Sequence, residues 1–230
     1  MIRFGEISSE LHKSSLDNTS AYREIKPKEA LSKEAADDYW NDIFENETDV
    51  QEDDTDLLLE VFDRSEDEFI FDFEISDDIT ELIQRILGIE WSNLDDGEKE
   101  GIIESLSNEI SDLLELEDQP NLFYYDADEN DCGAYNQETN SIELNRNLLP
   151  NPSELIDTIA HELRHAYQYQ KAMNPESLLD MLYRVNFENY IFPVCLGDGR
   201  FLFFTDYYDQ LVEVEARAFA KQFTKMEAVV

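Results

Sequence analysis

The sequence has few of the residues that define several large classes of protein. Only 2 of its 230 residues are cysteine, so it cannot carry the disulfide framework of small secreted proteins. No apolar run approaches the length of a membrane span, and no phosphate-binding glycine loop is present. No basic stretch followed by an apolar one occurs near the first residues, so no signal peptide of the usual kind is expected. We therefore expect a cytoplasmic protein, unless it is exported by a route that reads no such signal.

Basic residues are also scarce. The chain has 17 Lys and Arg against 55 Asp and Glu, which gives a formal net charge of −38. Binding to phosphate groups needs clustered Lys and Arg, so nucleic acids and anionic membrane surfaces are disfavoured as partners. The charge alone fits an acidic structural protein or a DNA mimic, which is one of the alternatives considered below.

Histidine is the third scarce residue, and two of the three histidines lie in one motif. The motif is His161-Glu162-Leu163-Arg164-His165, a His-Glu-x-x-His sequence. Residues four apart lie one turn apart on the same face of a helix, so His161 and His165 can bind one metal ion. Glu162 lies about 100° round the helix, beside the metal and able to take a proton from a bound water. Zinc catalysis needs this combination of ligands, open position and nearby base.

The remaining ligand is sought downstream, because the third histidine, His12, lies far away in a polar segment. The last predicted helix offers two carboxylates, Glu213 and Glu215. The apolar residues Val212, Ala216, Phe219 and Phe223 define the buried stripe of that helix, and the two glutamates flank it on opposite sides. Periodicity does not choose between them; it predicts one ligand and one surface charge.

The remaining elements predict an α+β fold. Residues 1–56 are expected to form a polar and acidic arm with one helix at about 28–45, and residues 57–118 a helical scaffold. In that scaffold the alternation of Phe69, Phe71, Phe73 and Ile75 predicts a strand. Helices are expected from 77 or 78 to about 87 and from 92 or 95 to about 116.

From residue 119 the pattern changes to short strands followed by longer helices. Strands are expected at 122–125, 132–135 and 141–145, helices at about 151–171 and 176–183, two strands at 190–194 and 201–204, and a last helix at about 207–226. The fold expected is a small antiparallel or mixed sheet packed on the motif-bearing helix and on the C-terminal helix, with extra helices on the N-terminal side.

Three segments together resemble a known family. They are Gly133-Ala134-Tyr135 followed by Ile142-Glu143-Leu144-Asn145, the motif segment 159–168, and Glu213-Val214-Glu215-Ala216-Arg217-Ala218-Phe219-Ala220. This order resembles the gluzincin zinc metallopeptidases, and within them the small bacterial ImmA/IrrE-type peptidases. The resemblance covers about residues 120–226. It implies a zinc metallopeptidase-like catalytic domain at 119–230, and it selects Glu213 as the third ligand.

The resemblance also implies a mechanism for cleaving a peptide bond in a protein or peptide substrate. Zinc would be held by His161, His165 and Glu213, and Glu162 would accept a proton from the zinc-bound water. A further donor is needed for the developing oxyanion. Tyr208 is the residue we select, with Tyr207 and Arg164 as alternatives. Thr158, Asp157 and Glu215 are candidates for orienting the histidines.

The resemblance further implies that the strand at 141–145 is the edge of the sheet above the active-site cleft. An extended substrate would then add to it as a further strand, bound through Ile142, Glu143 and Leu144. Two alternatives to a zinc peptidase stand: a metal-binding interaction module of the same fold that no longer hydrolyses, and an acidic DNA mimic or structural protein without a metal. The sequence indicates no oligomeric state.

Overall fold

The structure is a computed structural model that describes residues 65–127, 132–192, 194–195 and 201–225. The described residues all belong to one compact unit. The predicted N-terminal arm and its helix at about 28–45 lie outside them. The domain boundaries expected near residues 56 and 118 stay predictions.

The first described segment crosses the C-terminal helix without joining the sheet. It begins with a short 3-10 helix, η1 (Glu66–Glu68), and continues as extended chain to Ser76. The alternation of Phe69, Phe71, Phe73 and Ile75 does give alternating burial, but the strand predicted here is wrong, because the segment pairs with no strand in the described part of the chain. Phe71 and Phe73 pack on Phe219. Their ring centroids lie 5.6 and 5.5 Å, respectively, from the ring centroid of Phe219. Apolar contact with a helix therefore produces the same alternation as a sheet.

Two predicted scaffold helices are confirmed. Helix α4 (Asp77–Leu87) is capped by the Ser76 side chain and ends before Gly88. A 3-10 helix, η2 (Ile89–Asn93), leads to α5 (Asp96–Leu113), which begins with a capping box formed by Asp95 and Glu98.

The sheet is mixed and has three strands, β1 (Asn121–Tyr125), β2 (Gly133–Asn136) and β3 (Ser141–Asn145). Their order is β1-β3-β2, with β1 parallel and β2 antiparallel to β3. The prediction that 141–145 is an edge strand is therefore wrong. The backbone of β3 is paired on both sides, so a substrate cannot add to Ile142, Glu143 and Leu144 as a further strand.

A 3-10 turn, η3 (Arg146–Leu148), precedes the longest described helix, α6 (Pro152–Met173), which is followed by α7 (Leu178–Glu188). A two-stranded hairpin of β4 (Val194–Cys195) and β5 (Phe201–Leu202) comes next. The single last helix predicted from about 207 is instead two helices, α8 (Phe204–Tyr208) and α9 (Leu211–Thr224). The break is at Gln210, whose side-chain amide bonds both the N–H and the carbonyl of Ile191, at 2.8 and 3.0 Å.

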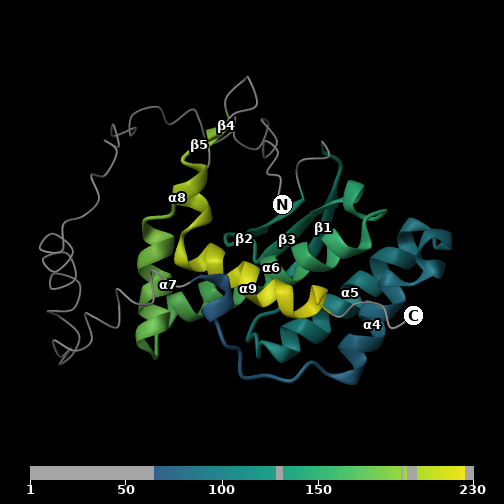
Figure 1. Ribbon diagram of the computed structural model, residues 1–230, viewed down its shortest axis with the longest axis horizontal. Helices are drawn as coiled ribbons and strands as arrows, with labels where there is room; N and C mark the ends of the chain where they lie inside the picture. The colour runs from purple at the N-terminus through teal and green to yellow at the C-terminus, as the bar shows by residue number, and fades with distance from the viewer. Residues whose placement is uncertain (1–64, 128–131, 193, 196–200, 226–230) are drawn as a thin grey trace, which may run out of the picture. The chain divides into compact units, whose positions relative to one another are not determined.

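The combination of helices with a small mixed sheet confirms the α+β class. Helix α6 lies between the sheet and α9, with α4 and α5 to the right of it and α7 to the left in Figure 1. The core draws apolar side chains from α4, α5, β3, α6 and α9. Among the residues that the structure describes, no helix combines the length and the apolar character needed to cross a membrane.

Candidate metal centre

Helix α6 carries the two motif histidines one turn apart. Its apolar side, which includes Leu155, Ile159 and Leu163, is fully buried in the core. His161 and His165 project from another side, and they do not face open solvent. Both are more than nine-tenths buried, because α9 packs along α6 over much of its length. The histidines therefore meet side chains of α9.

Glu213, in the first turn of α9, completes a group of three potential ligands. The two histidine Nε2 atoms lie 2.9 Å apart, and the Glu213 carboxylate oxygens lie 3.5 Å from Nε2 of His161 and 3.3 Å from Nε2 of His165. Four tetrahedral ligands about 2.0–2.1 Å from zinc would be about 3.3 Å from one another. The observed spacings are close to that value. Two imidazoles and one carboxylate are also a donor set that zinc accepts, so these residues fit a metal ion.

The charges within this group are coupled. Burial by itself raises the pKa of Glu213, but the neighbouring His165 outweighs it and holds that pKa well below the usual range. Burial by itself lowers the pKa of His165, but Glu213 outweighs it and raises the pKa to about 9. Without a metal, a proton on His165 compensates the buried carboxylate. A metal cation bound between them would take over that role.

Glu215 lies on the same helix but belongs to a different set of contacts. Its carboxylate accepts hydrogen bonds from Arg164 Nη2 at 2.5 Å, Tyr183 OH at 2.7 Å and Gln168 Nε2 at 2.7 Å. The prediction that one of the two glutamates is a surface charge is wrong, because Glu213 and Glu215 are 1% and 2% exposed. In geometry it is Glu213, not Glu215, that the structure brings to the two histidines.

Glu162 is buried next to the histidines and is held by the sheet. Its Oε2 accepts a hydrogen bond from the backbone N–H of Tyr135 in β2, at 2.8 Å. Burial raises the pKa of Glu162, and the nearby His161 and His165 oppose the shift without cancelling it. The carboxylate is therefore a stronger base than an exposed glutamate.

The predicted tyrosines divide between two places. The Tyr207 hydroxyl donates to Glu213 Oε2 at 2.8 Å, and Tyr190, just after α7, also donates to Glu213. Tyr208, which we selected from the sequence, does not join them. Its hydroxyl donates to Glu66 at 3.1 Å, and its ring lies under the Arg217 guanidinium, 3.4 Å from the ring centroid. Adjacent residues in the short helix α8 face different ways, and the sequence does not indicate which one faces the histidines.

The other predicted residues are close to the metal ligands without joining them. Arg164 is bound to Glu215, and its guanidinium packs on the rings of Tyr167 and Phe219. Thr158 is buried where α6 passes Gly133 of β2. Asp157 lies one turn before His161; burial raises its pKa, and His161 opposes that shift.

Two contributors were missed from the sequence. Gln168 bonds Nδ1 of His165 at 2.9 Å, and Tyr190 bonds Glu213. Gln168 follows His165 by three residues, a spacing that puts neighbours together on a helix, so this contact had a signal. Tyr190 reaches Glu213 because of the path that the chain takes after α7. The local sequence gives no signal that predicts this path.

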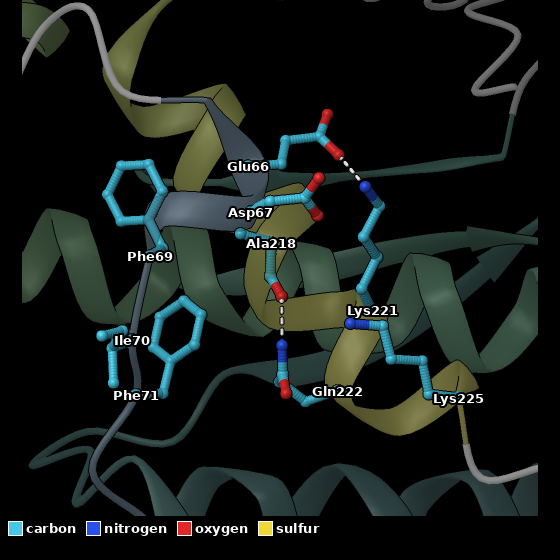
Figure 2. A pocket seen from close by; sticks show the side chains of 9 residues that line it. All are labelled: Glu66, Asp67, Phe69, Ile70, Phe71, Ala218, Lys221, Gln222 and Lys225. Atoms are coloured by element: carbon cyan, nitrogen blue, oxygen red, sulfur yellow. Dashed lines mark hydrogen bonds and ion pairs between the residues drawn. The ribbon is translucent and has the colours of Figure 1, made fainter.

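A pocket of about 300 Å³ lies along α9, and neither histidine nor Glu213 lines it. Figure 2 shows Glu66 and Lys221 meeting there, with Phe69, Ile70 and Phe71 along one side. Glu66 also accepts from Arg217 Nε at 2.6 Å. These contacts fasten the segment at 65–71 to α9, so they stabilise the helix that carries Glu213.

A family model described as "Putative metallopeptidase family (DUF6782)" matches residues 103–188. Over those residues the chain resembles a metallopeptidase. The matched part includes His161, Glu162 and His165 and ends before Glu213, so the similarity covers the motif but not the third ligand. No curated protein and no solved structure is found to match the chain.

Proposed function

We propose that this protein is a zinc-dependent endopeptidase of the gluzincin type. The observation that carries the proposal is the convergence of His161, His165 and Glu213, with their ligand atoms within 4.8 Å of one another and Glu162 beside them. The similarity of residues 103–188 to a metallopeptidase family supports it independently. Zinc is the proposed metal because two imidazoles and one carboxylate leave a position open for water, as in catalytic zinc sites.

When bound, the zinc ion would supply Lewis acidity toward a peptide carbonyl and lower the pKa of a coordinated water. The protein supplies the proton transfers. Glu162 takes a proton from the attacking water and passes it to the departing amine. Its raised pKa suits both steps, and the hydrogen bond from the Tyr135 N–H holds its carboxylate in one orientation.

Tyr190 and Tyr207 supply the hydroxyl donors. Burial, reinforced by the negative charge of Glu213, raises the pKa of each well above the ordinary value, so both remain protonated. In this structure both hydroxyls donate to Glu213. Either one would turn from that carboxylate to donate to an oxyanion that develops next to the metal ligands. Tyr208 has no part in this proposal, because its hydroxyl bonds Glu66, which is not one of the proposed metal ligands.

The substrate we propose is an extended or locally unfolded segment of a protein, bound along β2. Among the described strands β2 pairs with β3 alone, and its Tyr135 N–H is directed to Glu162 instead of to β3. A peptide that adds to this side of β2 would lie beside Glu162 and the histidines. Backbone pairing of this kind gives affinity with little sequence preference.

A hydrolysis assay with matched variants tests the proposed function. The zinc-loaded wild-type chain should cleave an unfolded reporter protein, and a chelator should abolish cleavage. Glu162→Gln should bind zinc as the wild type does but lose cleavage, because the amide keeps the shape of the side chain and cannot accept the proton. Full cleavage by Glu162→Gln would remove Glu162 from the mechanism.

The same assay separates the alternatives. Zinc binding without cleavage of any unfolded reporter would favour the silent interaction module. A chain that binds no metal would leave the acidic structural protein or DNA mimic, against which the buried and converging ligand set argues.

A further inference from the structure

Gln168 is a fully buried residue of α6 that contacts one proposed metal ligand and is not itself a ligand. Its side-chain amide lies between His165 on the same helix and two acceptors on α9. The contacts are His165 Nδ1 at 2.9 Å, the Val212 carbonyl oxygen at 3.0 Å and Glu215 Oε2 at 2.7 Å.

The acceptors on α9 fix the orientation of this amide. A carbonyl and a carboxylate only accept hydrogen bonds, so Gln168 must turn its NH₂ group toward Val212 and Glu215. The reverse orientation would put the amide oxygen against two other acceptors. The amide oxygen therefore faces His165, and it can only accept, so Nδ1 of His165 must carry a hydrogen.

We propose that Gln168 is the positioning residue that determines which nitrogen of His165 is presented to the metal. With the hydrogen held on Nδ1, the free lone pair is on Nε2, the atom that faces His161 and Glu213. This inference rests on the proposed metal site and adds to it the residue that orients one ligand.

The support for Gln168 extends through three helices. Glu215, which fixes the amide, is itself held by Arg164 of α6 and Tyr183 of α7. The bond from Gln168 to the Val212 carbonyl adjoins Glu213, so the same amide links the orientation of one ligand to the position of another. His161 has no equivalent support, since its buried Nδ1 makes no hydrogen bond within the described part of the chain.

The zinc affinities of two separate glutamine-to-methionine variants test the proposal. Gln168→Met keeps the length of the side chain and removes both its donor and its acceptor. Loss of such a supporting residue typically weakens metal binding by about 10- to 100-fold, and we expect a loss in that range. Gln170→Met is the matched control on the same helix, because Gln170 bonds the Glu117 N–H and the Asp118 carbonyl instead; its zinc affinity should equal that of the wild type.

The comparison distinguishes the failure of this inference from the failure of the proposed function. A folded Gln168→Met chain that binds zinc as tightly as the wild type would overturn the role of Gln168 alone, even if its melting temperature were lower. A wild-type chain that binds no zinc would overturn the metal site, and the inference with it.

A measurement on the wild type decides the question if Gln168→Met does not fold. In the chain loaded with ¹¹³Cd as a substitute for zinc, ¹⁵N NMR of the histidines should show coupling of the metal to Nε2 of His165, with a proton retained on Nδ1. The chain has three histidines, which keeps the assignment simple. Coupling to Nδ1 of His165 would overturn the proposal.

Discussion

Glu213 and Glu215 lie two residues apart on α9 and are both buried, yet their carboxylates belong to different sites. Glu213 lies within 3.5 Å of both histidines, whereas Glu215 forms a buried ion pair with Arg164. One turn of the helix thus carries both a proposed metal ligand and a carboxylate that stabilises the fold. Replacing each in the same way should separate the two roles.

Glu213→Gln should lower zinc affinity strongly, because a neutral amide is a poor substitute for a carboxylate ligand. Glu215→Gln should keep more of the zinc affinity but unfold more easily, because Arg164 is left in the interior without its counter-ion. Removing one partner of a buried ion pair typically costs about 3–5 kcal/mol. Metal titration and chemical denaturation of both variants provide the two readouts. If Glu215→Gln lost the metal while Glu213→Gln retained it, the assignment of the third ligand would be reversed.

Removing the hydroxyl of Tyr207 should lower kcat and leave KM nearly unchanged. Loss of one oxyanion donor typically lowers kcat by about 100-fold or more, and Tyr207→Phe is expected to show a loss of that order. Tyr208→Phe is the neighbouring control and should cleave at the wild-type rate, because its hydroxyl bonds Glu66. Equal losses in both variants would show that the effect arises from the stability of α8 and not from the hydroxyl.

Gly133→Ala should destabilise the fold where β2 meets α6. A Cβ atom at this position would lie 2.7 Å from the Glu143 carbonyl oxygen and 3.1 Å from the Thr158 side chain. Overpacking of this kind typically costs about 1–3 kcal/mol. Gly101→Ala, in the exposed middle of α5 with no atom within 4 Å of the new Cβ, should instead stabilise by about 0.5–1 kcal/mol. Denaturant titrations compare the two, and equal stability would contradict the tight packing of β2.

The wild-type chain should be more stable to unfolding than Glu66→Gln, by an amount that depends on pH. Burial by itself raises the pKa of Glu66, but Arg217 and Lys221 outweigh it and lower the pKa below the ordinary 4.5. A carboxylate with a lowered folded pKa stabilises the fold above its unfolded pKa, and this is lost as the pH falls through the folded value. Glu66→Gln should therefore melt below the wild type at pH 7, by about 2–4 °C at most, and the difference should shrink below about pH 4.5.

Asp67→Asn is the control for this experiment. The net charge is −38, so removing any carboxylate also reduces the repulsion between negative charges, whatever its contacts are. It makes the same change of charge one residue away and leaves the ion pairs of Glu66 with Arg217 and Lys221 in place. A difference between wild type and Glu66→Gln that stayed constant from pH 7 to pH 3 would contradict the ion pairs of Glu66.

Local patterns in the sequence predicted α4, α5 and α6 and the pairing of the two histidines well. The spacing of His161 and His165 depends only on helical geometry, and the structure has both residues on α6 with their Nε2 atoms together. Three of the strands also fall close to their expected ranges.

Long-range pairing was not predictable from the same patterns. The resemblance to the gluzincins implies that β3 is an edge strand, but β1 returns beside it in parallel, and no local signal encodes that order. The break at Gln210 likewise depends on its bonds to Ile191, from a distant part of the chain. The periodicity of α9 showed that Glu213 and Glu215 flank an apolar stripe, but the burial of Glu215 depends on Arg164 and Tyr183, which come from two other helices.

The most direct test of the metal centre is the zinc content of the purified wild-type chain beside His161→Ala, measured by elemental analysis after dialysis against trace zinc. We expect one zinc per wild-type chain and almost none in His161→Ala, because the loss of one of three protein ligands leaves too few to hold the ion. Equal zinc in the two proteins, or none in the wild type, would contradict a metal site at His161, His165 and Glu213.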